Sequence, residues 1–244
     1  MRNLAIFVAS IALATPVPAI GCSVIEDYRV PTNLQLAADA DLIFLAKVQS
    51  GSTGINGPDA TMTVVPMEVL KGSASIGQPL KLPGSIAEPR FSVLSNPLEL
   101  EQAHPLAYIG ACVRTMFVRD ATVLFFVKPA EKAFKGDVPP AMKGMLVNAG
   151  GPFSRWAEDV ISANSPWVRA TRVYVKASSL PKEQQATFLK TERDNLVGAG
   201  DQESKVVADD IDRQLKGPNK PWNQLMREEI EKMKARGEDP LKNL

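Results

Sequence analysis

Histidine and cysteine are scarce in this chain of 244 residues, which has one histidine, His104, and two cysteines, Cys22 and Cys112. A structural zinc site takes about four Cys or His ligands, so the composition excludes the familiar zinc-binding folds. Any histidine-based catalysis would depend on His104 alone, and no Gly-x-Ser-x-Gly sequence, the nucleophile turn of many hydrolases, accompanies it. We therefore expect no catalytic residue, no metal site and no cofactor.

An excess of charge of either sign is also lacking, and aromatic residues are few. Lys and Arg total 28, Asp and Glu total 27, and aromatic residues make up 6% of the chain. A near-zero balance argues against binding to nucleic acid or to an anionic membrane surface, and single-stranded nucleic acid also needs stacking aromatic side chains. With 45% hydrophobic and 23% charged residues, the composition is that of an ordinary globular protein that does not bind nucleic acid.

One long apolar run is present, and it lies in the first 21 residues, which have the pattern of a signal peptide. Arg2 supplies a positive start, and residues 4–14 form an apolar stretch of eleven. That is shorter than the about twenty residues that span a bilayer. Ala19-Ile20-Gly21 then provides small residues before a cleavage site. We expect cleavage before Cys22 and an exported protein, periplasmic or secreted.

Cleavage there would make Cys22 the first residue, and two alternatives follow. Ala-Ile-Gly-Cys fits a lipoprotein signal, and a lipidated sulfur cannot form a disulfide. In an oxidising compartment, two cysteines are instead expected to pair, which would join Cys22 to Cys112. We favour the disulfide, and a lipoprotein anchored to the membrane through Cys22 is the alternative.

Seven segments before residue 177 have strand character. Apolar and β-branched residues dominate them, and Pro66 inside one of them requires an edge position or a bulge. A short helix with Thr32 or Asn33 as its N-cap is expected over 33–40. Residues 83–105 hold four prolines and are expected to form a long surface excursion. The expected strands are 41–50, 61–70, 78–82, 112–117, 121–128, 145–147 and 170–176, and a further short helix is expected at 153–161.

After residue 178 the density of charged residues rises and the β-branched runs end. Helices are expected over 181–197, 202–216 and 221–236, with Gly and Pro residues between them. One interpretation is a helical appendage that packs on the β domain. The other is that the last helix docks into a partner's groove through its apolar stripe. That stripe consists of Trp222, Leu225, Met226, Ile230 and Met233.

Four short segments, in this order, resemble the netrin-like (TIMP-like) family. They are the mature start Cys22-Ser23, the stretch ADADLIFLAKV at 38–48, the sequence EVLKG at 68–72, and Cys112 ahead of the apolar LFFV at 124–127. The resemblance covers roughly residues 22–165. It implies a mainly β fold, a five-stranded OB barrel over 22–178, followed by a charged helical extension over 179–244. It also implies a disulfide between Cys22 and Cys112.

The resemblance also implies a way to bind protein. Metalloproteinase inhibitors of this family chelate the protease zinc with the free α-amine and carbonyl of their first cysteine, and a disulfide holds that wedge rigid. Carried over, Cys22 would be the chelator and Ser23 the residue that enters the specificity pocket. Gly51, Gly54 and Pro58 would lie in a flanking contact loop.

This chain departs from the inhibitors at its mature start, because Cys22-Ser23-Val24 stands where they carry Cys-x-Cys. The principal expectation is therefore a non-enzymatic protein-binding module of the cell envelope or periplasm, with an unidentified protein partner. A metalloproteinase inhibitor that acts through Cys22 is the first alternative, and a structural, lipid-anchored envelope lipoprotein is the second.

Overall fold

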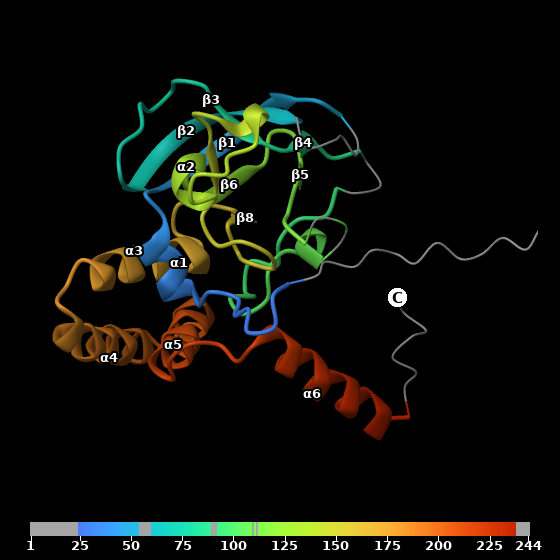
Figure 1. The fold of residues 1–244 in the computed structure, drawn as a ribbon. Helices are drawn as coiled ribbons and strands as arrows, with labels where there is room; N and C mark the ends of the chain where they lie inside the picture. Colours follow the sequence, from blue (N-terminus) through green and yellow to red (C-terminus); the bar gives the residue numbers. More distant parts are fainter. Residues whose placement is uncertain (1–23, 54–59, 89–91, 109, 111, 238–244) are drawn as a thin grey trace, which may run out of the picture.

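The computed structural model describes residues 24–53, 60–88, 92–108, 110 and 112–237. Its helices are α1 (Asn33–Asp39), α2 (Ala130–Ala133), α3 (Pro166–Ser178), α4 (Lys182–Ala199), α5 (Gln202–Leu215) and α6 (Trp222–Ala235), with short 3-10 helices η2 (Pro105–Tyr108) and η3 (Pro140–Met142). In Figure 1 a β-sheet lies at the top, α1, α3, α4 and α5 form a layer below it, and α6 projects away from the body.

The main sheet is antiparallel and has six strands. Its order is β3–β2–β1–β6–β7. The sixth strand, β8, also pairs with β6, at residues 123–125, whereas β7 pairs with residues 127–129. These strands are β1 (Leu42–Gly51), β2 (Thr61–Lys71), β3 (Leu80–Pro83), β6 (Thr122–Pro129), β7 (Leu146–Asn148) and β8 (Ala157–Asp159). A separate parallel pair joins β4 (Ser85–Ile86) to β5 (Met116–Phe117). Among the described residues no ladder joins the two edge strands β3 and β7, so the sheet is open and the expected closed barrel is not shown.

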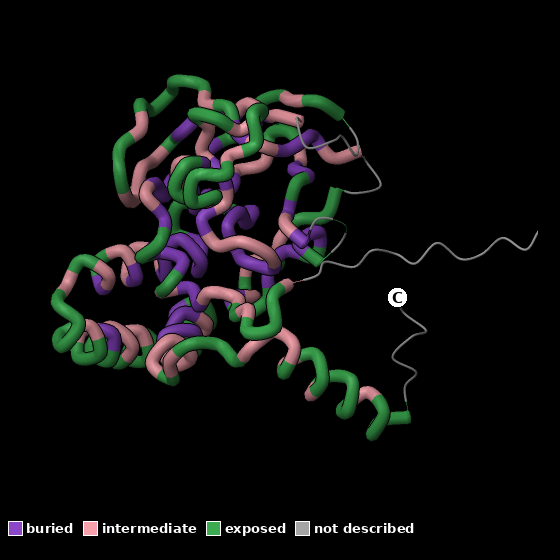
Figure 2. The backbone as a smooth tube through the Cα atoms, in the orientation of Figure 1, coloured by how far each residue is buried: buried purple, intermediate pink, exposed green. Residues whose placement is uncertain are grey.

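Strands β1 and β6 are buried on both faces, which explains their continuous apolar runs. Successive side chains of a strand point to opposite faces. Ile43 and Phe126 therefore face the helical layer, whereas Phe44 and Phe125 stack on each other on the opposite face, with ring centroids 5.5 Å apart. Figure 2 shows buried residues concentrated between the sheet and the helices.

The expected strand at 170–176 is wrong, because this segment lies inside helix α3. Pro166 occupies the first turn, a position that suits its fixed φ. Buried residues then recur every three or four positions, which is the helical period. They are Trp167, Ala170, Thr171, Tyr174 and Ala177. The alternation of Val173 and Val175 with polar residues covers only a few positions. The helical spacing of buried residues extends from Trp167 to Ala177, and this longer pattern matches the structure.

A second expectation near the sheet is also wrong, and a third holds only in part. The segment 153–161 contains no helix and instead supplies β8, because Ala157, Glu158 and Asp159 pair with β6. The strand expected at 112–117 is confined to Met116–Phe117. In both cases the structure depends on hydrogen-bonded partners that lie far away in the sequence. A local pattern does not encode such partners.

The remaining expected elements are confirmed within a few residues at each end. Of the two expected caps, Thr32 is the one that caps α1, through a capping box with Gln35. Pro66 lies opposite Ala46 where the β1–β2 register shifts, and beyond the part of β2 that pairs with β3. It therefore occupies an irregular edge position. The three helices expected after residue 178 are α4, α5 and α6.

The turn at Lys71 and Gly72 ties the end of β2 to α1. The Nζ of Lys71 donates hydrogen bonds of 2.8 Å to the carbonyl oxygens of Ala37 and Ala38, which end α1. A cation at a helix C-terminus also complements the helix dipole. Gly72 has φ of 79°, and an added Cβ would lie 2.3 Å from the carbonyl oxygen of Asp41. This turn therefore needs glycine both for its backbone angle and for space.

A buried carboxylate joins α5 to α1 and α3. Asp210 is fully buried and accepts hydrogen bonds from the Tyr174 hydroxyl at 2.5 Å and the Asn33 amide at 2.9 Å. Arg213 forms an ion pair with it at 2.9 Å. Burial and the adjacent Asp210 carboxylate raise the pKa of Tyr174 well above its usual range. Around this cluster α1, α3, α4 and α5 share one hydrophobic core with β1 and β6.

Candidate functional site

Most residues that the family resemblance assigns to protease contact cannot be placed. Outside the described residues are the predicted signal peptide over 1–21, Cys22, Ser23, Gly54 and Pro58. Gly51 is described and is the last residue of β1, opposite Met62 of β2. A contact role for this end of the molecule therefore stays a prediction.

Cys112 lies in a bend and not in a strand. Its φ of 53° is in the left-handed region, and its carbonyl oxygen accepts a hydrogen bond of 2.7 Å from the N–H of Phe153. The residue is buried next to the loop that carries Phe153. Its pairing with Cys22 stays a prediction, because Cys22 lies outside the described residues.

The predicted partner-binding helix, α6, is fixed to the body at its first turn. The ring of Trp222 stacks on Phe153, with centroids 4.0 Å apart and planes at 11°, and Tyr108 stacks beside both. The backbone N–H of Trp222 donates a hydrogen bond of 2.7 Å to the carbonyl oxygen of Tyr28. Asn219, just before the helix, donates to Val30 at 2.9 Å. The N-terminal part of the described chain therefore holds the start of α6.

Beyond this first turn the apolar stripe of α6 is not buried. No residue of the helix is buried, and Met226 and Ile230 are each 39% exposed. Leu225 and Met233 are half-buried on the same stripe. Figures 1 and 2 show the helix extending outward, mostly exposed along its length. The structure thus brings the five predicted stripe residues onto one helix face, and the ring of Trp222 stacks on the body.

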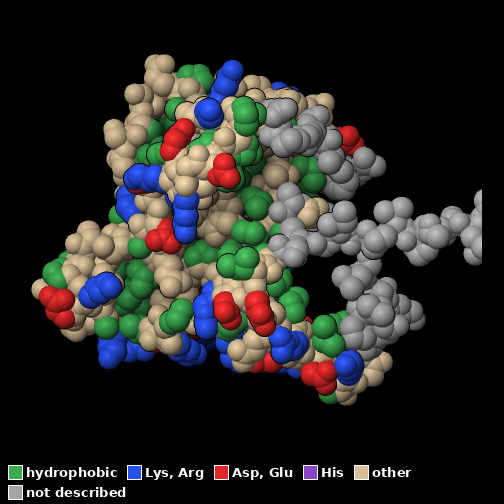
Figure 3. Space-filling view, in the orientation of Figure 1, with side chains coloured by type: hydrophobic (Ala, Val, Ile, Leu, Met, Phe, Trp, Pro, Cys, Tyr) green, Lys and Arg blue, Asp and Glu red, His purple; other side chains and the backbone are tan. Residues whose placement is uncertain are grey.

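The polar face of α6 neutralises its own charges. Lys220 contacts Glu228 at 2.8 Å, and Lys234 contacts Glu231 at 3.0 Å. Hydrogen bonds from Lys220 and Gln224 hold the pKa of Glu228 below its usual value. Figure 3 shows acidic, basic and hydrophobic side chains side by side along this helix. A partner would therefore meet a nearly neutral helix whose specificity lies in its apolar stripe.

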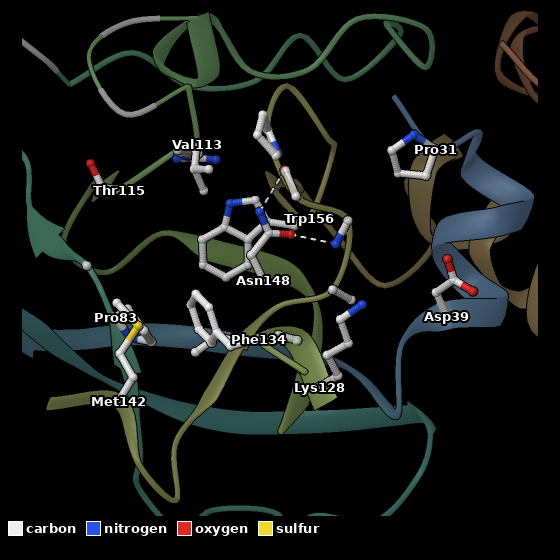
Figure 4. A pocket seen from close by; sticks show the side chains of 18 of the residues that line it. Pro31, Asp39, Pro83, Val113, Thr115, Lys128, Phe134, Met142, Asn148 and Trp156 are labelled. Carbon is white, nitrogen blue, oxygen red and sulfur yellow. Dashed lines mark hydrogen bonds between the residues drawn. The ribbon is translucent and has the colours of Figure 1, made fainter. Parts of the chain in front are cut away.

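A second feature is a large cavity between the two edges of the sheet. Its volume is about 940 Å³, and its walls come from β3, β4 and β5 on one side and from β7, α2 and η3 on the other. Figure 4 shows the Trp156 indole in the middle of the cavity, with Pro83 and Met142 at one end and Lys128 and Asp39 at the other. Trp156 is itself buried, in contact with Phe117 and Phe125. No sequence pattern indicates this cavity.

Most polar groups of the cavity wall are already occupied. The Asn148 side chain accepts from the Gly150 N–H at 2.7 Å and donates to the Gly151 carbonyl at 2.9 Å, as Figure 4 also shows. Arg114 donates to Asp159 at 2.9 Å and to the carbonyl oxygens of Met116 and Ala157. These bonds leave the interior of the cavity mainly apolar.

His104 belongs to a buried polar cluster that holds the 92–108 excursion against β8. Its Nε2 lies 2.9 Å from the Val93 carbonyl oxygen, and its Nδ1 accepts from the Leu106 N–H at 3.1 Å. Ser95 donates to Glu158 at 2.6 Å from the same excursion. Burial, and then the nearby Arg114 guanidinium, lower the pKa of His104. Both ring nitrogens are occupied, so this histidine acts as a structural clamp.

Neither a metal cluster nor a membrane-spanning helix is found in the described part of the chain. Within these ranges no group of three or more His, Cys, Asp or Glu residues is placed to hold a metal ion. No described helix is long and apolar enough to cross a membrane. Comparison with protein-family models and with curated proteins found no match.

The sequence located α6 and its stripe but missed the cavity and the polar cluster. The stripe lies in one continuous segment with a helical period. The cavity gathers residues from the N-terminal segment, five strands and α2. Trp156, the residue at its centre, was expected on a helix. The only signal for it was an apolar tryptophan beside a glycine-rich turn, which does not indicate a cavity.

Proposed function

We propose that this protein is an exported, non-enzymatic protein-binding module of the cell envelope or periplasm, and that α6 docks into its partner. The observation that carries the proposal is the apolar stripe of α6, which is anchored at Trp222 and left unburied beyond it. Amphipathic helices of this kind insert into apolar grooves, with anchor residues spaced three or four apart. The expected partner is therefore a different protein that presents such a groove.

A non-enzymatic role is supported by the state of His104. A general base needs a free ring nitrogen within reach of the proton that it removes. The hydrogen bonds to Val93 and Leu106 occupy both nitrogens. The best candidate for acid–base catalysis in the sequence is therefore engaged in holding a loop.

We also propose that the sheet is an opened OB-like arrangement of the netrin-like type. β1, β2 and β3 form a meander, β6 pairs with the free side of β1, and β7 pairs with β6. Cα atoms of β3 and β7 come within 8 Å of each other. OB folds are five-stranded, partly open barrels, and this strand order would close if β3 paired with β7.

Export rests on the signal-peptide pattern, and the intact mass of the protein purified from its native host tests it. We expect a mass that begins at Cys22 and rises by about two hydrogens on reduction, which corresponds to one disulfide. A mass that includes residues 1–21 would contradict export. A mass increased by lipid would contradict the disulfide and support the lipoprotein alternative.

The docking role of α6 can be tested by photocrosslinking in native cells. A photoreactive phenylalanine analogue replaces Ile230 on the stripe, or Glu231 as the matched control on the opposite face, where the side chain is 72% exposed. We expect one discrete product from position 230 that contains a second protein and is absent from position 231. Adding Met226→Glu should abolish that product.

Two outcomes of the crosslinking experiment would contradict the proposed docking of α6 to a different protein. Equal products from both positions would mean that the stripe does not select the partner. A product that contains only this chain would mean that the helix contacts a second copy and not a different protein.

A further inference from the structure

The cavity beside Trp156 touches both edge strands of the open sheet. Pro83 ends β3 and Val147 lies in β7, the two edge strands, and both line the cavity. The volume of about 940 Å³ lies at the upper end of the range of small-molecule sites, about 300–1,000 Å³. Mouths of β-barrels are frequent positions for such sites.

The walls suit a hydrocarbon body. Met116, Phe134, Met142, Val147 and Trp156 are the larger apolar residues around the cavity. The hydrogen bonds of Asn148 and Arg114 are used within the protein, as described above, and the indole N–H of Trp156 is covered although it has no acceptor among the described residues. A ligand with many hydroxyl groups, such as a sugar, would lose its hydrogen bonds to water here without replacing them.

One end of the cavity is charged. Arg29, Lys128 and Asp39 line this end, which gives two cations against one carboxylate. Arg29 already donates a hydrogen bond of 2.6 Å to the Asn219 carbonyl oxygen. Lys128 forms no ion pair with a described residue, and Figure 4 shows its amine at the same end as Asp39. An anionic group would therefore find an unpaired ammonium at the mouth of an apolar space.

We propose that this cavity binds an amphiphile with a hydrocarbon body and a carboxylate head, the class of long-chain fatty acids. The hydrocarbon lies against Trp156 between β3 and β7, and the carboxylate lies at Lys128. This site is separate from α6 and adds a ligand-binding function to the protein-binding role proposed above.

The three tryptophans provide the test, because only one of them lines the cavity. Trp167 packs on Phe126 in the helical core, and Trp222 lies at the root of α6. Dibromostearate, titrated below its micellar concentration into the purified protein, quenches tryptophans that its bromine atoms contact. We expect saturable quenching that unbrominated stearate reverses and that Trp156→Phe removes. Quenching that persists in Trp156→Phe would place the lipid elsewhere and overturn the proposal.

Two variants separate the head from the body of the ligand. Lys128→Gln is expected to weaken stearate binding about tenfold, the effect of losing one charge-assisted hydrogen bond. Lys190→Gln, an exposed lysine of α4, is the matched control and should bind as the parent does. Stearyl alcohol should bind about as weakly as stearate binds to Lys128→Gln. Equal affinity of acid and alcohol for the parent protein would overturn the assigned head group.

Ala133→Phe tests the cavity without removing a core side chain. Ala133 is half-buried on α2, and a larger residue there projects into the space that it lines. We expect loss of the saturable quenching with an unchanged circular dichroism spectrum. Ala141→Phe, at an exposed position that does not line the cavity, is its control. Unchanged binding in Ala133→Phe would contradict the assigned position.

Discussion

Helices α5 and α6 are similar in length and pattern but differ in what covers them. Each has 14 residues and an apolar stripe with polar residues opposite. Val207, Ala208 and Ile211 of α5 are buried against the core, whereas α6 has no buried residue. The difference teaches that a helical period fixes which face is apolar, while the partner of that face depends on contacts far away in the sequence.

Polar contacts also distinguish the two helices. α5 carries Asp210, whose partners Asn33 and Tyr174 lie on two other helices. The charged residues of α6 pair with one another along their own helix or with Lys220 just before it. A buried carboxylate with fixed partners selects one docking geometry, whereas surface ion pairs stabilise a helix without placing it.

The largest expected effect comes from removing the buried carboxylate of Asp210 in α5. Asp210→Ala should lower the free energy of unfolding by about 3–5 kcal/mol, because it leaves buried partners without their charged acceptor. Asp209→Ala, at the adjacent exposed position, is the control and should change it by less than about 0.5 kcal/mol. Chemical denaturation of both variants measures the difference. Equal effects would mean that the buried hydrogen bonds of Asp210 do not contribute to the free energy of unfolding.

A matched pair of isoleucines compares the two stripes directly. Ile211→Ala in α5 should cost about 2–5 kcal/mol, since it removes a fully buried side chain. Ile230→Ala in α6 should stay within about 0.5 kcal/mol, because its side chain is 39% exposed. Thermal and urea unfolding give both values. A large loss at Ile230 would show that the stripe of α6 is covered within the protein itself.

The anchor of α6 should have a local effect. Trp222→Ala removes the stacking on Phe153 and Tyr108, and such aromatic pairs contribute about 0.5–1.5 kcal/mol beyond their buried area. Amide hydrogen exchange in the first turn of α6 should become faster by up to about tenfold. Exchange in α5 should not change. Faster exchange in both helices would mean that α6 is coupled to the core.

Protonation of Glu228 in α6 should have the smallest effect. The pKa of Glu228 is lower in the folded protein than its ordinary value of 4.5. Its ion pair with Lys220 therefore stabilises the helix above that value and is lost as the pH falls through the lower, folded pKa. The protection factors of the α6 amides, which correct for the intrinsic pH dependence of exchange, should fall on acidification, and Glu228→Gln should flatten this dependence. A variant that keeps the full dependence would contradict the assignment.

The sequence was informative where one segment carries its own signal. The capping residues Thr32 and Asn33 marked the start of α1, and the β-branched run at 61–70 marked β2. It failed at α3 because a short alternation of Val173 and Val175 resembles a strand, although the buried positions follow a helical period. It missed the cavity because residues from many separate segments line that space, which no local pattern carries.

The buried hydrogen bond between Asn33 and Asp210 also has a kinetic consequence. Its two residues are 177 positions apart, so α1 cannot complete its docking until α5 has been synthesised. Contacts of such long sequence separation form late and slow folding. An N-terminal helix that waits for the last third of the chain keeps the protein incompletely folded during synthesis. That delay suits a chain which, under the proposed export, must cross a membrane before it folds.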